Sequence, residues 1–465
     1  MSLTMNNLNK IIELSNYYQK NSQTSNRDKI VSQIYSQSEI IAKQAIRNNK
    51  DKTTDLDKRL DDILTSKIFG YPIMLLILSI VFWMTIVGAN YPSQILATIF
   101  FYLQEQLTNL FQYFNAPEWL RGFLVDGVYR GLAWVVSVML PPMAIFFPLF
   151  TILEDLGYLP RVAFNLDRFF QKAGAHGKQS LTMSMGFGCN AAGIISCRII
   201  ESPRERLIAI LTNNFVPCNG RFPTLITVAT IFFGAAVSAL YSTIIASMVI
   251  VGIVIVGIIV TLITSWLLSK TLLKGVPSSF TLELPPYRKP QIMKVFIRSV
   301  YDRTMFVLKR AVKIAAPAGA ITWLLANTYL NGNSLIDIGA NFLQPLGYAI
   351  GLDGYILMAF ILGFPANEIV FPILIMSYLS QGSLMELDSF AALKTLLLDH
   401  GWTWLTALNL LLFSLLHFPC GTTMLTIKKE TGSIKWTALA FIIPTSIAFL
   451  VTFAVAQTVR LLGIL

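Results

Sequence analysis

The chain has 465 residues, of which 54% are hydrophobic and 13% are charged, and its mean hydropathy is +0.60. These values exclude an ordinary soluble globular protein and indicate a polytopic membrane protein. The net charge of +11 does not require a nucleic-acid partner, because membrane proteins concentrate lysine and arginine in cytoplasmic loops. The four cysteines form no CxxC pair, so they are expected to be reduced rather than to form a disulfide scaffold.

Residues 1–67 are polar and predict a cytosolic helical segment. They begin without a basic region followed by an apolar core, so a cleaved signal peptide is not expected, and the N-terminus is expected in the cytosol. In "RDKIVSQIYSQSEIIAKQAIR" apolar residues recur at helical spacing, namely Ile30, Ile34, Ile41 and Ala45. Such an apolar face needs a partner.

Residues 68–465 are interpreted as a membrane permease domain, because apolar runs of about 20 residues, enough to cross roughly 30 Å of hydrocarbon, recur along them. The predicted spans are Tyr71–Val87, Gly131–Phe150, Phe222–Tyr241, Thr243–Leu268, Ala311–Tyr329, Leu405–Ile427 and Thr437–Val459. Together with two irregular apolar segments, they predict an all-α polytopic membrane protein with about 8–10 membrane segments.

Loop charge predicts the sides on which the connections lie. Residues 269–313 hold ten Lys or Arg and residues 151–180 hold four, so both are expected to be cytoplasmic. Residues 88–130 hold two arginines, 330–354 hold neither Lys nor Arg, and 379–404 hold one lysine. These three segments are therefore expected to be external.

A segment whose two flanks lie on one side must enter the membrane and return. Residues 355–378 lie between external flanks, so they predict a re-entrant or broken segment from that side. Residues 181–197 predict one from the cytoplasmic side, because the arginines Arg198, Arg204 and Arg206 follow them. The two segments would then point at each other.

Two pentapeptides predict an internal repeat. "GFGCN" (186–190) and "GFPAN" (363–367) share Gly, Phe and Asn at matching positions. Opposed broken segments in two related halves are typical of inverted-repeat transporters, whose substrate site lies near the midplane of the bilayer. We expect two gate repeats near residues 131–268 and 311–459.

Three glycines mark the first irregular segment. Gly186, Gly188 and Gly193 permit close approach or positive φ, so they are expected to let the chain unwind there. Irregular backbone is tolerated at membrane depth only where protein or a water-filled cavity surrounds it. The alternative is that small residues merely let helices pack closely.

Three of the four cysteines stand beside residues that interrupt helices. Cys189 and Asn190 follow a glycine, and Cys218 and Cys420 each follow a proline. A lone membrane cysteine is usually a small hydrophobic residue. Because Gly and Pro here expose backbone carbonyls, we expect ligand roles for these three, with Cys197 as the exception.

Glu368 is a carboxylate in an otherwise apolar segment. Placing it at a helix centre costs about 2.5–3.5 kcal/mol, and such residues usually mark an ion or substrate path. The alternative is a structural pair with Arg198 or Arg221. Thiolate, amide oxygen and carboxylate, with a thioether from Met183 or Met185, suit a borderline first-row ion better than Na⁺ or Ca²⁺. This composition indicates a transition metal.

These motifs resemble those of a known family. "GFGCNAAGIISCRIIESPRERL", "NNFVPCNGRFP", "GFPANE" and "HFPCGTTMLTIKKETGSIKW" are similar to the gate and core motifs of the ferrous iron transport protein B (FeoB) family. "LDKRLDDILTSKIFGYPIMLLIL" resembles the segment that enters its first span, and the likeness runs from about residue 56 to the end of the chain. The resemblance implies uptake of ferrous iron across the cytoplasmic (inner) membrane of a prokaryote.

The resemblance also implies which residues line the path. Asn367 and Ala191 stand where the family motifs usually have Lys and small residues, so the fine selectivity does not carry over. By this resemblance, Cys189, Asn190, Cys218 and Glu368 match positions that line the path. Asn367 and Cys420 are predicted metal-path residues as well, Cys420 because of its place beside a proline.

Family members usually begin with a GTP-binding domain, and this sequence contains no GxxxxGK[ST] motif. The nearest string, "GAHGKQS", has the wrong spacing and lacks Ser or Thr after the lysine. The resemblance therefore implies that this chain binds no nucleotide, and we predict that residues 1–67 dock a separate small GTP-binding protein. The other expected partners are Fe²⁺, the lipid bilayer and further copies of the chain.

Other functions remain open at this point. A nucleoside or other organic-solute transporter of a related gate-repeat fold would make the cysteines incidental, and a broader divalent transition-metal permease would use the same ligands. A membrane enzyme is disfavoured, because the chain has three histidines, no HExxH motif and no Ser/His/Asp grouping near a span. A non-transporting regulatory subunit is a further alternative.

Overall fold

The computed structural model describes residues 26–45, 53–66, 68–234, 239–275, 287–288, 291–380, 382–384 and 390–463. These residues are helical apart from loops and one short hairpin, in which β1 (Tyr329–Leu330) pairs antiparallel with β2 (Asn333–Ser334). In this part of the chain five helices are long and apolar enough to cross a membrane. A sixth span is possible if α15 (Leu335–Ala349) and α16 (Gly354–Leu362), bent by 114°, count as one. The predicted all-α membrane fold is confirmed.

The shorter helical elements of the described chain comprise α-helices, three π-helices (η1, η4 and η5) and three 3₁₀-helices (η2, η3 and η6). They are α2 (Asn26–Ala45), α3 (Thr53–Leu64), α5 (Glu118–Arg121), η1 (Gly122–Tyr129), α7 (Tyr158–Lys172), α8 (Gln179–Gly188), α9 (Asn190–Ser196), η2 (Cys197–Ile199), α10 (Pro203–Thr212), η3 (Asn213–Phe215), α11 (Phe222–Val228), η4 (Ala229–Gly234), α13 (Ile292–Arg298), η5 (Ser299–Thr304), η6 (Asn367–Ile369), α17 (Val370–Tyr378), α18 (Phe390–Asp399), α19 (Trp404–Leu416) and α20 (Gly421–Thr431).

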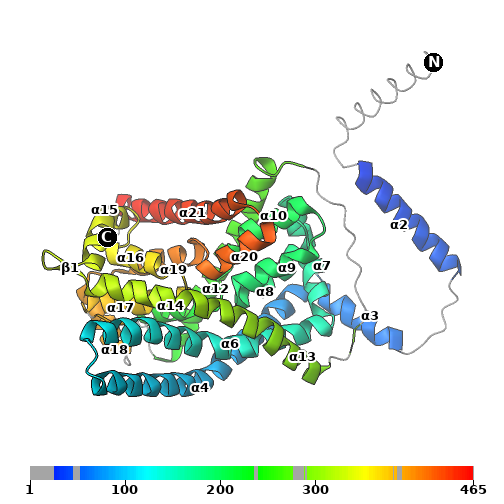
Figure 1. The fold of residues 1–465 in the computed structure, drawn as a ribbon. Helices are drawn as coiled ribbons and strands as arrows, with labels where there is room; N and C mark the ends of the chain where they lie inside the picture. Colours follow the sequence, from blue (N-terminus) through cyan, green and yellow to red (C-terminus); the bar gives the residue numbers. More distant parts are fainter. Residues whose placement is uncertain are drawn as a thin grey trace, which may run out of the picture.

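Five of the described helices have more than 20 residues. They are α4 (Gly70–Tyr113), α6 (Arg130–Asp155), α12 (Ala239–Lys270), α14 (Met305–Asn327) and α21 (Ile434–Leu461). Helices α4, α6 and α14 lie side by side across the molecule (Figure 1). The first part of the segment expected to be external, residues 88–130, is helical, because α4 continues to Tyr113. The side of the membrane on which it lies stays a prediction. A scarcity of Lys and Arg marks an external loop, but it equally marks a helix that continues in lipid.

Two hairpins of short helices occupy the centre. Helices α8 and α9 pack against each other, and so do α16 and α17. The 10 residues of α8 rise about 15 Å, half the thickness of the hydrocarbon layer. Helix α8 starts from the end of the molecule where α7 and α10 lie, and α16 starts from the opposite end, beside α15 (Figure 1). The sequence predicts that segments 181–197 and 355–378 are re-entrant or broken. Both are broken, and they start from opposite ends of the molecule. That they enter the membrane from opposite faces stays a prediction.

Two further spans are interrupted. Helix α10 leads through η3 and an irregular stretch, residues 216–221, into α11, and α19 leads through residues 417–420 into α20. The span predicted over Leu405–Ile427 lies within a candidate membrane span, Trp404–Thr431, that is broken at residues 417–420. Hydropathy does not register the break, which falls at Pro419, a residue that cannot donate a helix hydrogen bond. The end of the span predicted over Phe222–Tyr241 includes residues outside the described part of the chain.

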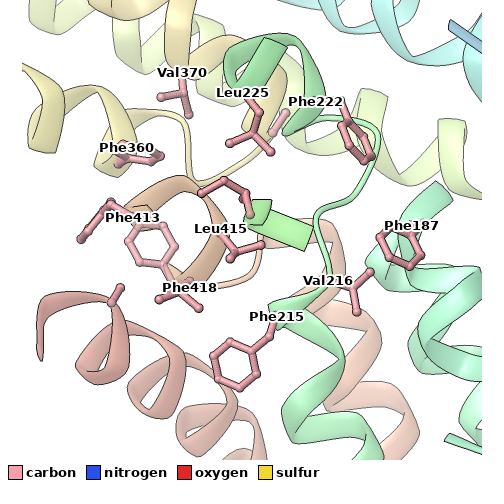
Figure 2. Close-up of a cluster of buried hydrophobic side chains, with 14 of the residues drawn as sticks. Phe187, Phe215, Val216, Phe222, Leu225, Phe360, Val370, Phe413, Leu415 and Phe418 are labelled. Carbon is pink, nitrogen blue, oxygen red and sulfur yellow. The ribbon is translucent and has the colours of Figure 1, made fainter. Parts of the chain in front are cut away.

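Buried apolar side chains fill the space around these breaks (Figure 2). Phe215 and Leu415, which adjoin two of the breaks, are fully buried. The rings of Phe360 and Phe413 meet edge to face with 4.9 Å between their centroids. Close packing of this kind keeps the interrupted backbone surrounded by protein, which irregular backbone at membrane depth requires.

Helix α2 stands away from the rest of the chain (Figure 1). The side chains that form its predicted apolar face are exposed, with Ile30 at 57%, Ile34 at 57% and Ile41 at 64%. Much of residues 1–67 lies outside the described residues, so the docking of a partner on this segment stays a prediction.

A buried arginine ties α3 to the membrane part. Arg161, on α7, donates to both carboxylate oxygens of Asp61 at 2.9 and 3.2 Å, and its guanidinium lies 4.0 Å from the centre of the Tyr287 ring. The Tyr287 hydroxyl also donates to Asp61, at 2.7 Å. Burial raises the pKa of Asp61, but the hydrogen bonds from Arg161 and Tyr287 and the charge of Arg161 outweigh it and lower that pKa.

Asp61→Asn is expected to loosen α3, because the charged partner of a buried arginine is lost. Limited proteolysis should then cut residues 53–66 faster than in the wild type, whereas Asp62→Asn, an exposed neighbour, should change nothing. Because the pKa of Asp61 is lowered, the ionic contribution should be complete above the ordinary value of 3.8 and be lost only as the pH falls through the lowered pKa. Equal cleavage of both variants would contradict this attachment.

Candidate functional site: a cavity where four helix breaks meet

The interrupted segments surround one small cavity of about 30 Å³. A volume of this size holds one or two waters, or an ion that has lost most of its hydration shell. Its lining comes from both hairpins, both interrupted spans, α6 and α14: Met139, Met143, Gly188, Cys189, Asn190, Cys218, Asn219, Gly220, Ala311, Pro365, Ala366, Asn367, Glu368, Cys420, Thr422 and Thr423. All six residues predicted to line a metal path are in this set.

The tips of the two hairpins have the same backbone conformation. Cys189 lies between α8 and α9 in an extended conformation with φ −155° and ψ 124°. Ala366 precedes η6 with φ −152° and ψ 120°. In each hairpin the next residue, Asn190 or Asn367, begins the second helical arm. The likeness of "GFGCN" to "GFPAN" thus corresponds to a shared local structure.

The side chains of Cys218 and Asn367 meet across the two halves. The Asn367 Nδ2 lies 3.9 Å from the Cys218 Sγ and donates a hydrogen bond to it. The Asn367 side-chain oxygen is buried and has no hydrogen-bond partner among the described residues. A buried acceptor without a donor is costly, so this oxygen is available to a ligand that enters the cavity.

Glu368 projects from the second hairpin against the backbone of the first half. A Cβ atom at Gly220 would collide with the Glu368 carboxylate, so a larger residue there would displace that carboxylate. Neither suggested structural partner pairs with Glu368. Arg198 forms two hydrogen bonds of 2.7 Å with Glu430, and Arg221 binds backbone carbonyls. The carboxylate has no ion pair within the described part of the chain.

Of the two remaining cysteines, Cys420 lines the cavity and Cys197 does not, which agrees with the predicted set of path residues. The Cys420 Sγ lies at the start of α20, 3.3 Å from the Thr423 Oγ1. Cys197 is fully buried, donates to the Gly193 carbonyl at 3.3 Å and does not line the cavity.

The thioethers differ from the expectation. Met183 and Met185 are absent from the lining, whereas α6 contributes Met139 and Met143. The sequence does contain a pattern that could have pointed to Met139 and Met143. In "VMLPPMAIFF" each of them lies within two residues of the double proline.

The side chain of Asn190 helps to hold the first hairpin together. With its amide oriented to satisfy both atoms, its nitrogen donates to the carbonyls of Gly186 at 3.1 Å and Val216 at 3.2 Å. The backbone carbonyl of Asn190 accepts from the Asn213 Nδ2 at 3.2 Å. Asn190 therefore has a structural role beside the ligand role that the sequence predicts.

Gly186, Gly188 and Gly193, here called the gate glycines, let side chains of neighbouring segments approach the hairpin backbone closely. Gly186 and Gly188 are helical, and none of the three has positive φ. A Cβ at Gly186 or Gly193 would meet the amide of Asn213, at 3.1 Å and 2.6 Å, and one at Gly188 would collide with a phenylalanine ring of α6. The chain does break in this stretch, as expected, but the break falls at Cys189, directly after Gly188, and not at a glycine with positive φ.

Gly193→Ala is expected to destabilise the protein by about 1–3 kcal/mol, because the added methyl overlaps the Asn213 amide. Asn213→Ala removes the overlapping atoms, so the double variant should be more stable than the sum of the single effects predicts. Thermal unfolding in detergent measures all three. Strictly additive effects would mean that the two side chains do not compete for the same space.

Arg221 has a structural role at the helix breaks that the sequence did not reveal. It is 1% exposed and donates to the carbonyls of Asn214 at 2.8 Å and Leu415 at 2.7 Å. It also donates to the carbonyls of His417 and Phe418, at 3.2 and 3.3 Å. These acceptors lie where α19 ends and where the stretch before α11 begins. One guanidinium thus satisfies carbonyls that two helix breaks leave open.

The possible ligands surround the cavity without closing on one point. Among the described residues, no three His, Cys, Asp or Glu side chains lie close enough to hold a metal ion together. Tight structural sites bring three or four such ligands to one ion, whereas conduction requires binding weak enough for release. The arrangement suits a passage with weak contacts better than a permanent metal centre.

Comparison with known proteins gives two family matches. Residues 136–232 and 308–434 match the Gate family, described as "Nucleoside recognition". Residues 250–302 match the family described as "Ferrous iron transport protein B C terminus". The two Gate segments contain both hairpins and both interrupted spans.

The similar curated proteins are named as iron transporters. The chain is 31% identical over 411 residues to the Fe(2+) transporter FeoB of Staphylococcus aureus (strain MSSA476), covering 86% of this chain and 58% of that protein. It is 29% identical to the FeoB of Methanocaldococcus jannaschii, covering 93% and 63%. A fusion of Fe(2+) transport protein A with FeoB from Porphyromonas gingivalis is 26% identical, covering 89% and 53%. The chain thus spans about three fifths of the length of these relatives, and no solved structure gives a significant match.

Proposed function

We propose that this chain, which belongs to the ferrous iron transport protein B family, carries Fe²⁺ across the cytoplasmic membrane of a prokaryote. The observation that carries the proposal is the cavity: four helix breaks from two related halves bring three cysteines, an unpartnered amide oxygen and a carboxylate to one ion-sized space. Thiolate and carboxylate together suit a borderline divalent ion.

Each group has a distinct task in this proposal. Glu368 offsets the cost of bringing a dication into a region of low dielectric constant. The sulfur atoms of Cys189, Cys218 and Cys420 favour Fe²⁺ over the harder Mg²⁺ and Ca²⁺. The Asn367 oxygen and backbone carbonyls at the breaks replace lost water. Because thiols must lose protons to bind a metal, uptake falls as the pH drops.

The size of the cavity argues against transport of a nucleoside, which the description of the Gate family suggests. Sites for molecules of drug size occupy about 300–1,000 Å³, ten or more times the 30 Å³ observed here. A larger cavity of about 670 Å³ does lie between α4, α6, α7, α8, α11 and α12, but apolar side chains line almost all of it. It lacks the converging polar groups that would recognise a sugar or a base.

A separate GTP-binding protein fits this proposal as a regulator. The described N-terminal helix α2 exposes an apolar face, and Arg161 joins α3 to α7, the helix that leads into the first hairpin. A protein docked on α2 would therefore act on the hairpin through α3 and α7. The proposed topology places these elements, and the N-terminus, in the cytosol.

The test is uptake of ⁵⁵Fe²⁺ under reducing conditions by cells that lack other ferrous iron uptake. Expression of the chain should restore uptake. Excess Co²⁺ and Zn²⁺ should compete, because this ligand set discriminates poorly among neighbouring divalent ions, whereas Mg²⁺, Ca²⁺ and nucleosides should not. Restored nucleoside uptake without iron uptake would overturn the proposal in favour of the organic-solute alternative.

A further inference from the structure

A line of buried polar residues leads away from the cavity toward the end of the molecule where α7 and α10 lie. The Asn213 Nδ2 donates to the backbone carbonyl of Asn190, a cavity residue, at 3.2 Å. Thr212 precedes Asn213, and its hydroxyl oxygen accepts from the Gln179 Nε2 at 2.8 Å. Gln179 starts α8, and its backbone nitrogen donates to His176, outside the hairpin.

The residues on this line are deeply buried, and some of their polar atoms have no hydrogen-bond partner among the described residues. Gln179, Thr212 and Asn213 are each 0% exposed. The side-chain oxygens of Asn213 and Gln179 have no hydrogen-bond partner among the residues described. An apolar residue would avoid the cost of a buried acceptor without a donor. Two such acceptors on one line are open to contact with water or with a cation.

The surroundings of Asn213 fit a passage. Its amide lies between the two arms of the first hairpin, where Gly186 and Gly193 present no side chain. A small movement of α8 against α9 would therefore uncover it. Toward the far end of the line lies Glu205, a carboxylate that is 1% exposed, 3.8 Å from the Arg204 Nη1. Amide oxygens followed by a carboxylate are ligands that a partly hydrated cation accepts.

From this placement we propose that the cation leaves the cavity along this line, with the side-chain oxygens of Asn213 and Gln179 as successive contacts between the hairpin and α10. The proposal rests on the proposed function for the identity of the ion. The passage itself is a property of the protein, and it can be tested without iron.

The first test measures access of water to the line. Asn213→Cys and Gln179→Cys variants in sealed membrane vesicles of each orientation are treated with a charged, membrane-impermeant methanethiosulfonate reagent. Mass spectrometry of peptides then assigns labelling to each cysteine. The matched controls are Thr261→Cys and Thr452→Cys, two positions of 0% exposure on α12 and α21.

We expect labelling of both path cysteines from the side on which α10 lies and none of the controls. Fe²⁺ should slow the labelling. Unlabelled path cysteines, or labelling equal to the controls, would overturn the passage. Labelling that Fe²⁺ does not slow, in a protein that transports Fe²⁺, would overturn its use by the cation. Absence of iron uptake in the wild type would instead count against the proposed function, because the labelling is read independently.

The second test keeps the approximate shape of Gln179 and removes its amide, both the unpartnered oxygen and the nitrogen that donates to Thr212. Gln179→Met should lower ⁵⁵Fe²⁺ uptake at least about tenfold at matched membrane abundance and unchanged thermal unfolding temperature. Thr452→Val, which removes a buried hydroxyl that donates only within α21, should leave uptake unchanged. Wild-type uptake in Gln179→Met would overturn the assignment of this residue.

Discussion

Uptake of ferrous iron is expected to fall at least about tenfold when Glu368 is replaced by glutamine. The substitution keeps the shape of the side chain that packs on Gly220 and removes the carboxylate charge that Glu368 brings to the cavity. A dication in this low-dielectric space then has no carboxylate to offset the loss of its hydration, and each 1.4 kcal/mol of lost stabilisation reduces occupancy tenfold. The measurement is ⁵⁵Fe²⁺ uptake at matched membrane abundance.

Cysteine variants extend this test with an internal control. Cys189→Ser and Cys218→Ser should also reduce uptake and should weaken competition by Zn²⁺ more than by Mn²⁺, because sulfur favours the softer ions. Cys197→Ser should be nearly silent, since that sulfur faces the Gly193 carbonyl and not the cavity. Unchanged uptake in Glu368→Gln, Cys189→Ser and Cys218→Ser together would eliminate the metal path. Loss in Cys197→Ser alone would mean that the wrong thiol was identified.

Arg221→Met is expected to have the largest effect on stability, about 3–5 kcal/mol or more. Removing the guanidinium leaves the carbonyls at two helix breaks without donors, and each buried unsatisfied acceptor costs about 1–3 kcal/mol. Arg221→Lys should be intermediate, because an ammonium keeps the charge but cannot reach four acceptors in fixed directions. Thermal unfolding in detergent and the amount of protein in the membrane measure both variants.

A surface arginine variant provides the comparison. Arg198→Met removes two hydrogen bonds to Glu430, but the Arg198 side chain is 62% exposed, so its loss should cost no more than about 1 kcal/mol. Equal stability of Arg221→Met and Arg198→Met would show that the breaks do not depend on the buried cation.

The sequence predicted the central features of the fold because each has a local chemical signature. Loop charge and the likeness of two pentapeptides were enough to predict two opposed hairpins, and the structure contains both. Cysteines beside Gly or Pro were enough to select Cys189, Cys218 and Cys420, which line one cavity. That they bind a metal stays a prediction.

The features that were missed depend on contacts between distant segments. Pro419 interrupts a span that hydropathy alone presents as continuous, and α4 continues where low charge suggested a loop. Arg221 gave no signal of its role, because its acceptors at Leu415 and Phe418 lie almost 200 residues away. Met139 was missed for the same reason, since only the packing of α6 places it at the cavity.

The two hairpin tips share a backbone conformation but differ in their side chains, and this difference bears on the direction in which an ion would travel. The backbone at Cys189 and at Ala366 is nearly identical, yet one tip presents sulfur and the other presents a methyl group. An ion passing between the tips, as proposed above, would meet unequal chemistry where the local backbone is alike. The two directions of travel would then differ in the last side chain that the ion leaves.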